Sequence, residues 1–139
     1  MAKVVGIHRL ALKPGVKAAD FEDLMRKKVF PGLGVVIQVD KSISHGFTRA
    51  DWGLAENFLL RNTQDDKDGN YLWMIMAHVP ADKVSTEEGR LAVGREAQAI
   101  AQEFFDTGTN EESVAAVKLG PFATRTSFAT FIELGHSKL

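Results

Sequence analysis

The sequence predicts one small α+β domain built on an antiparallel sheet. The chain has 139 residues, of which 45% are hydrophobic, and this size and composition are typical of a single domain with an ordinary core. Apolar stretches with the two-residue period of a strand alternate with two amphipathic stretches of helical period. Turn-forming pairs such as Pro14-Gly15 and Gly120-Pro121 separate them, and no repeat or linker interrupts the chain. We therefore expect residues 1–139 to form one domain.

The first predicted strand runs from Lys3 to Lys13 and stops at the Pro14-Gly15 turn. A strand with apolar residues on both faces is covered on both sides, and hence lies in the middle of its sheet. One face carries Val4, His8, Leu10 and Leu12, and the other carries Val5, Ile7 and Ala11.

Two segments have the pattern of amphipathic helices. The first, Lys17–Phe30, ends at Pro31-Gly32 and has apolar residues at helical spacing. The second begins at the capping box Ser85-Thr86-Glu87-Glu88 and continues to about Phe105. Its predicted buried stripe is Leu91, Ala97, Ile100, Ala101 and Phe104.

The remaining strands include a hairpin. The β-branched segment Gly34–Ile43 is a predicted strand. A second extended segment, Ala55–Asn62, is joined by a polar loop to Tyr71–Val79, which is typical of a long-looped hairpin. Tyr71–Val79 is apolar on both faces, so we expect a second central strand.

The end of the chain adds one more strand. Val114–Leu119 is a predicted short helix or turn, and Thr124–Leu134 is the last strand, with Phe128, Thr130 and Ile132 on one face. The resulting order of elements is that of a split βαβ, ferredoxin-like βαββαβ domain. Two helices cover only one face of such a sheet, while the central strands are apolar on both faces. A second copy related by a two-fold axis would cover the open face, so we expect a homodimer.

The beginning of the chain resembles a known superfamily. The segment Val5-Gly6-Ile7-His8-Arg9-Leu10-Ala11-Leu12-Lys13-Pro14-Gly15-Val16, followed by Asp20-Phe21-Glu22-Asp23-Leu24, is similar to the entry of dimeric α+β barrel proteins. These include antibiotic-biosynthesis monooxygenase-like proteins, stress-responsive dimeric barrel proteins, plant-type polyketide cyclases and haem-degrading monooxygenases. The resemblance implies a fold and a homodimer more directly than an activity.

Charge and composition exclude several classes of partner. Seventeen Lys and Arg residues against eighteen Asp and Glu residues give a net charge of −1, so neither nucleic acid nor a membrane surface is an expected partner. The chain has no cysteine, which excludes disulfides and thiolate metal sites. His8 and Arg9 interrupt any signal-peptide hydrophobic region, and no apolar run is long enough to span a bilayer. We expect a cytoplasmic protein.

The candidate catalytic residues are His8, His78 and Tyr71. The histidines lie on two strands that would be neighbours, so they come close if the register places them on one face, and each is a candidate general base. The alternative is a structural histidine that bonds to the backbone or to water. The histidine spacings match no zinc motif. Haem-degrading relatives use a histidine on the second helix, which Ser85–Phe105 lacks. We therefore expect no metal and no cofactor.

Aromatic and cationic side chains are candidates for ligand binding. Trp73, Trp52 and Phe104 could line a pocket for a planar ligand, although such residues are often simply core. Arg9 and Arg61 could hold an anionic or enolic oxygen, although strand arginines often point to water or pair with carboxylates.

Two kinds of function remain open. The first is a small-molecule pocket between sheet and helices. Resemblance to the monooxygenase-like group implies cofactor-independent oxygenation of an aromatic or polyketide-like substrate. Resemblance to the cyclase group implies proton abstraction next to a carbonyl, with a histidine as base and Tyr71 as acid or oxyanion donor. The second is a non-enzymatic, stress-associated binding dimer.

Overall fold

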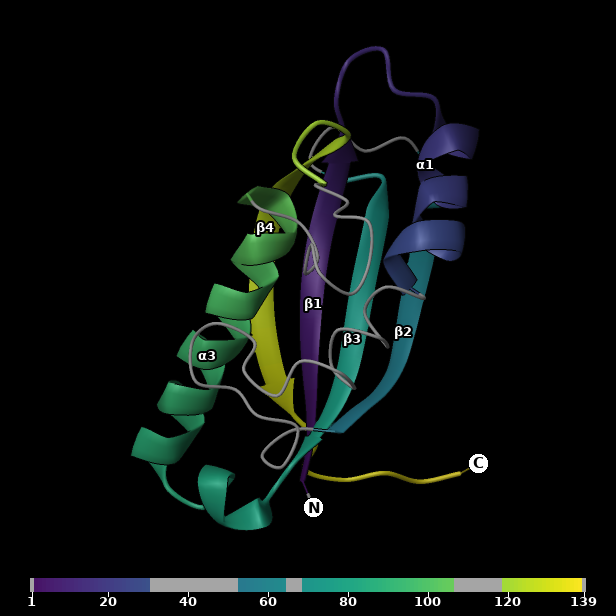
Figure 1. The fold of residues 1–139 in the computed structure, drawn as a ribbon. Coiled ribbons are helices and arrows are strands. Elements are labelled where there is room, and N and C mark those ends of the chain that lie inside the picture. Colours follow the sequence, from purple (N-terminus) through teal and green to yellow (C-terminus); the bar gives the residue numbers. More distant parts are fainter. Residues whose placement is uncertain (1, 31–52, 65–68, 107–118, 139) are drawn as a thin grey trace.

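The protein is an α+β domain with a four-stranded antiparallel sheet and helices, as its periodicity predicts (Figure 1). The computed structural model describes residues 2–30, 53–64, 69–106 and 119–138. The strands β1 (Ala2–Leu12), β2 (Gly53–Arg61), β3 (Tyr71–Val79) and β4 (Ala123–Ile132) have the spatial order β2-β3-β1-β4. Every neighbouring pair is antiparallel. β1 and β3 are the central strands, which confirms the prediction made from their two apolar faces.

The hairpin and the two helices agree with their predictions. β2 and β3 pair as the predicted hairpin, and the Asn62 amide donates to the Asn70 carbonyl at 2.6 Å at the end next to the connecting loop. The predicted segments Gly34–Ile43 and Val114–Leu119 lie outside the described residues. The first helix is α1 (Ala18–Leu24), continued by a π-helical turn, η1 (Met25–Val29). After β3, a 3₁₀ turn, η2 (Ala81–Val84), leads to α3 (Glu87–Asp106).

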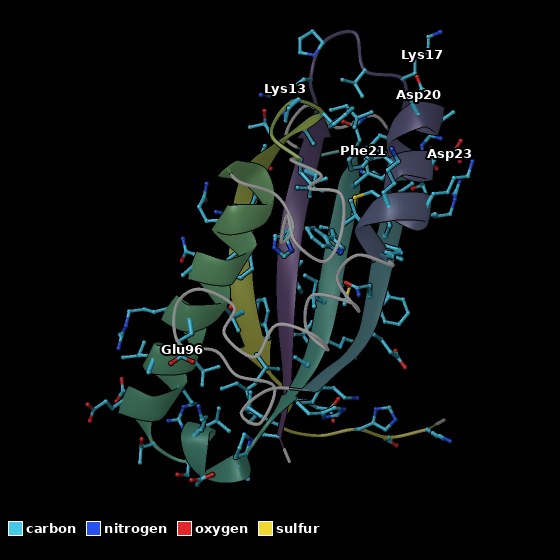
Figure 2. All side chains as sticks on the ribbon, viewed as in Figure 1. Lys13, Lys17, Asp20, Phe21, Asp23 and Glu96 are labelled. Carbon is cyan, nitrogen blue, oxygen red and sulfur yellow. The ribbon has the colours of Figure 1, made fainter. Side chains whose placement is uncertain are left out.

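Both helices pack on the same face of the sheet. From α1 and η1, Phe21, Met25 and Val29 join Leu10 and aromatic residues of β3 in one core cluster. Figure 2 shows Phe21 on the side of α1 toward the strands and Asp23 on the outer side. That first cluster consists of Leu10, Phe21, Met25, Val29, Tyr71, Trp73, Leu119 and Ala123. From α3, Val93 joins Val4 and Val79 in a second, smaller cluster.

The buried stripe of α3 differs from the prediction at Leu91. Leu91 is 58% exposed, whereas Val93 is buried and packs against Val4 and Val79. Positions 91 and 93 lie about 200° apart around a helix. The helix therefore presents one or the other to the sheet, and its contact with β1 and β3 selects the smaller residue.

The register of the strands defines rows of side chains across the helix-covered face. Residues directly opposite each other in paired strands point to the same face. We call one such row the histidine row: Leu59, Trp73, His8 and Phe128, from β2 to β4. The adjacent row, which we call the glycine row, is Asn57, Ile75, Gly6 and Thr130.

The opposite face of the sheet carries exposed apolar side chains. The strand residues of both core clusters all lie on the helix-covered face. Among the described residues, no helix therefore packs on the opposite face. Its large hydrophobic side chains are Phe58, Leu60, Leu72 and Phe131, with exposed fractions of 39%, 45%, 37% and 55%. We call this the open face. Within the described residues, no helix is long and apolar enough to cross a membrane.

Candidate functional site

His8 is a buried histidine at the centre of the sheet. Its side chain is 1% exposed, and Nδ1 lies 3.0 Å from the backbone carbonyl oxygen of Trp73. A carbonyl only accepts hydrogen bonds, so Nδ1 must carry the proton and donate it. In the neutral ring, Nε2 is then an acceptor. Among the described residues, this buried Nε2 has no hydrogen-bond partner.

Aromatic rings enclose the imidazole within the histidine row. The ring of His8 stacks on the indole of Trp73, with centroids 4.6 Å apart and an interplanar angle of 25°. On the other side, the ring of Phe128 is tilted against it at 4.8 Å. The guanidinium of Arg125 lies over Phe128, 5.3 Å from the ring centroid. The row therefore combines flat apolar surfaces with a single buried acceptor.

This environment keeps His8 neutral. Burial lowers the pKa of His8 from 6.5 to about 4, because the charged ring would lose its hydration. The hydrogen bond to the Trp73 carbonyl opposes this shift, while the positive charge of Arg125 adds to it. Near neutral pH the ring can therefore accept a hydrogen bond at Nε2 but carries no charge.

The glycine row places further polar groups beside His8. The Oγ1 atom of Thr130 is also buried without a hydrogen-bond partner among the described residues. At the other end of the row, the Asn57 side-chain oxygen accepts a hydrogen bond from the Trp73 indole at 3.2 Å. Gly6 lies between them without a side chain. Along β1, Gly6 and His8 lie between Val4 of the second core cluster and Leu10 of the first. The polar groups thus form a band between the two clusters.

Tyr71 belongs to a separate network that ties α1 to the sheet. Its hydroxyl donates to the Glu22 carboxylate at 3.1 Å, and the same carboxylate oxygen lies 3.7 Å from the Arg61 guanidinium. Burial and the hydrogen bond to Glu22 raise the pKa of Tyr71. The proton of Tyr71 is therefore engaged in the hydrogen bond to Glu22, which favours a positioning role for this hydroxyl over donation to a ligand.

The structure separates the candidate residues between the two faces. His8, Tyr71, Trp73 and Arg61 share the helix-covered face through their register. His78 lies five positions beyond Trp73 on β3, with Lys3 and Gly53 opposite, so it points to the open face. The two histidine side chains therefore lie on opposite faces of the sheet.

Other candidates lie on the open face or outside the described structure. Arg9 also lies on the open face, where its side chain packs against Gly69. Trp52 and the side chain of Phe104 lie outside the described part of the chain.

Several residues of the site were not candidates from the sequence. Asn57, Phe128, Thr130 and Glu22 acquire their place through pairing with distant segments. For Thr130 the sequence contained one weak indication of a site, since this polar residue lies on the same predicted strand face as Phe128 and Ile132. Within the described ranges, no group of three or more histidine or carboxylate residues could hold a metal ion.

Comparison with known proteins adds no relative: no family model, no curated protein and no solved structure matches this chain.

Proposed function

We propose that this chain is a homodimeric binding protein that holds one small aromatic or polyketide-like molecule beside His8 in each subunit. The observation that carries the proposal is the buried Nε2 of His8, an acceptor without a partner among the described residues. Leaving a buried polar atom unsatisfied costs about 1–3 kcal/mol, so such an atom usually has a ligand or an ordered water as its partner.

The surroundings of His8 favour a planar, largely apolar ligand. Binding sites for small molecules are mostly apolar and aromatic, with a few polar groups that fix orientation. Trp73 and Phe128 supply flat surfaces on either side of the imidazole. The neutral imidazole supplies the acceptor. A hydroxyl group on an aromatic or enolic ligand is the matching donor.

The same arrangement supports proton abstraction as the chemistry. Cofactor-independent oxygenation of an electron-rich substrate and the ring closure of a polyketide can both begin with the loss of a proton from a hydroxyl or an acidic carbon. His8 is neutral and can accept that proton at Nε2. Negative charge developing on the ligand would raise the pKa of His8 and so assist the transfer. A non-enzymatic, stress-associated binding protein, the second candidate, needs only the hydrogen bond.

For the fold, we propose the ferredoxin-like arrangement and a dimer of the α+β barrel type. The sheet order β4-β1-β3-β2, with α1 and α3 on one face, supports the first. The open face supports the second, because it carries exposed apolar side chains on β2, β3 and β4, and exposed apolar surface on a small domain often marks an interface. A second copy covers it with a symmetric, self-complementary surface.

The binding proposal predicts that replacing His8 weakens the capture of hydroxylated aromatic compounds. Protein purified directly from cells is analysed by mass spectrometry for bound small molecules, and a set of naphthols and phenolic ketones is then tested by equilibrium dialysis. His8→Leu should lower the affinity for the tightest compound about tenfold or more, because the ligand hydroxyl loses its acceptor.

His78→Leu is the matched control, since His78 points to the open face. It should leave the affinity within about twofold. Equal affinities for the wild type and the His8→Leu protein, with melting curves that show both to be folded, would contradict the proposal.

The dimer proposal predicts that a charge on the open face separates the subunits. Leu72→Glu and Phe131→Glu place a carboxylate among apolar side chains that the partner would bury, at a cost of several kcal/mol. Sedimentation equilibrium should give a dimer for the wild type and mostly monomer for each variant. Leu91→Glu, on the exposed side of α3, should remain dimeric. A monomeric wild-type protein at micromolar concentration would refute the proposed interface.

A further inference from the structure

We propose that Gly6 forms the floor of the ligand subsite, and that His8 and Thr130 bind the hydroxyl group of a planar ring that lies over it. The inference rests on the proposed function, because it specifies where the molecule beside His8 lies and which of its groups is recognised. It makes Gly6 and Thr130 determinants of specificity.

The first step is the position of the two buried polar atoms. His8 and Gly6 are successive residues of β1 on the helix-covered face, and Thr130 lies opposite Gly6 on β4. His8 and Thr130 are therefore diagonal neighbours across the pair of strands, within reach of one small molecule. His8 Nε2 and Thr130 Oγ1 are both buried and lack a hydrogen-bond partner among the described residues. Two such atoms on adjacent strands indicate one shared polar partner.

The second step is the backbone of Gly6. Among the described residues, a Cβ atom added at Gly6 would meet Cε2 and Cζ of Phe128 at 3.4 and 3.7 Å and the carbonyl oxygen of Ile75 at 4.0 Å. An alanine therefore fits without a clash, so neither close packing nor left-handed backbone requires glycine here. A glycine in the interior of a strand is unfavourable and often marks a close approach of a ligand or another backbone. The ring of Phe128 borders this position, and Gly6 itself is only partly buried, so we infer that the ligand ring packs on the Gly6 backbone beside Phe128.

The third step is the chemistry of the recognised group. His8 Nε2 is an acceptor at neutral pH because Nδ1 donates to the Trp73 carbonyl, so it requires a donor on the ligand. An ionised carboxylate has no proton to donate and would be repelled by the lone pair. The hydroxyl of Thr130 can donate to the same ligand oxygen. A phenolic or enolic hydroxyl satisfies both residues.

The test compares 2-naphthol with 2-methoxynaphthalene, which has the same ring without a donor, by equilibrium dialysis at neutral pH. The wild type should bind 2-naphthol about tenfold more tightly. Thr130→Val, which keeps the shape and removes the hydroxyl, should reduce the affinity for 2-naphthol three- to tenfold. Gly6→Ala should weaken both compounds at least tenfold, because its methyl group occupies the floor.

Stability separates this effect from misfolding. Gly6→Ala should leave the melting temperature unchanged or raise it, since alanine loses less conformational freedom on folding. The matched controls are Thr124→Val, on the open face, and Gly135→Ala, whose added Cβ would meet no atom within 4 Å. Both should bind 2-naphthol as the wild type does.

Each outcome decides a different question. The subsite would be refuted if the wild type bound the two compounds with equal affinity. It would also be refuted if folded Gly6→Ala and Thr130→Val bound 2-naphthol as tightly as the wild type. Neither result would contradict the proposed function. If neither compound binds the wild type up to its solubility, and the ¹⁵N resonance of His8 Nε2 does not move with either, the proposed function fails and the subsite with it. A shift of that resonance with 2-naphthol but not with 2-methoxynaphthalene would support both.

Discussion

Replacing Trp73 by alanine is expected to lower the free energy of unfolding by about 3–5 kcal/mol. The side chain is fully buried at the centre of the first core cluster. It also stacks on His8 and donates its indole N–H to Asn57 on β2. Its removal leaves a cavity and also leaves the side-chain oxygen of Asn57 without its donor. Both effects lower the free energy of unfolding.

Urea unfolding followed by circular dichroism measures this loss at a fixed protein concentration, because the proposed dimer would unfold at a midpoint that depends on concentration. Leu91→Ala serves as the control. Leu91 is 58% exposed on α3, and the substitution should change the free energy of unfolding by no more than about 0.5 kcal/mol. A loss below about 1 kcal/mol for Trp73→Ala would show that this indole is not the packed centre of the core.

Acid is expected to destabilise the protein through His8. The pKa of His8 is lowered from 6.5 to about 4 by folding, so the unfolded chain binds a proton more readily than the folded chain. The stabilising contribution of the neutral ring is fully present above about pH 6.5 and is lost as the pH falls to about 4. The difference in pKa corresponds to about 3 kcal/mol over this window.

Comparing the wild type with His8→Leu at several pH values isolates the contribution of His8 to the free energy of unfolding. The free energy of unfolding is measured at about pH 7.5, 5.5 and 4 for the wild type and for His8→Leu. All other ionisable groups are the same in both proteins, so the difference between the two profiles reports on His8. Asp23, for example, has a pKa lowered by Arg26 and Lys27 in both. Parallel pH profiles, or a His8 pKa near 6.5 by NMR, would contradict a buried neutral ring.

The proposed site depends on a division of the core. The helices pack on the sheet in two clusters, with aromatic and larger aliphatic residues beneath α1 and three valines around α3. The band between the clusters contains Gly6, His8, Asn57 and Thr130. Polar side chains and a glycine in such a place weaken the core, which natural sequences usually tolerate for function. The Gly6→Ala variant tests this directly, since it should combine unchanged or higher stability with weaker binding.

Much of the fold could be predicted because it depends on local periodicity. Apolar stretches bounded by turn residues identified β1 and β3, and alternation identified β4. Apolar residues on both faces placed β1 and β3 in the middle of the sheet. The helical spacing at Phe21 and Met25 identified the buried side of α1 and η1. The stripe of α3 was predicted wrongly at Leu91, because hydrophobic size alone does not decide which side of a helix meets the sheet.

The candidate site could be predicted only in part. The sequence by itself determined that His8, Tyr71 and Trp73 lie on central strands, because this follows from the pattern of each strand alone. Only the tertiary structure decided that His8 stands opposite Trp73 and that His78 points to the other face. Only pairing with β4 brought Thr130 beside Gly6. The physical reason is the register. Side chains alternate between faces with a period of two, so a shift of one residue between strands that are distant in the chain exchanges every side chain between the two faces.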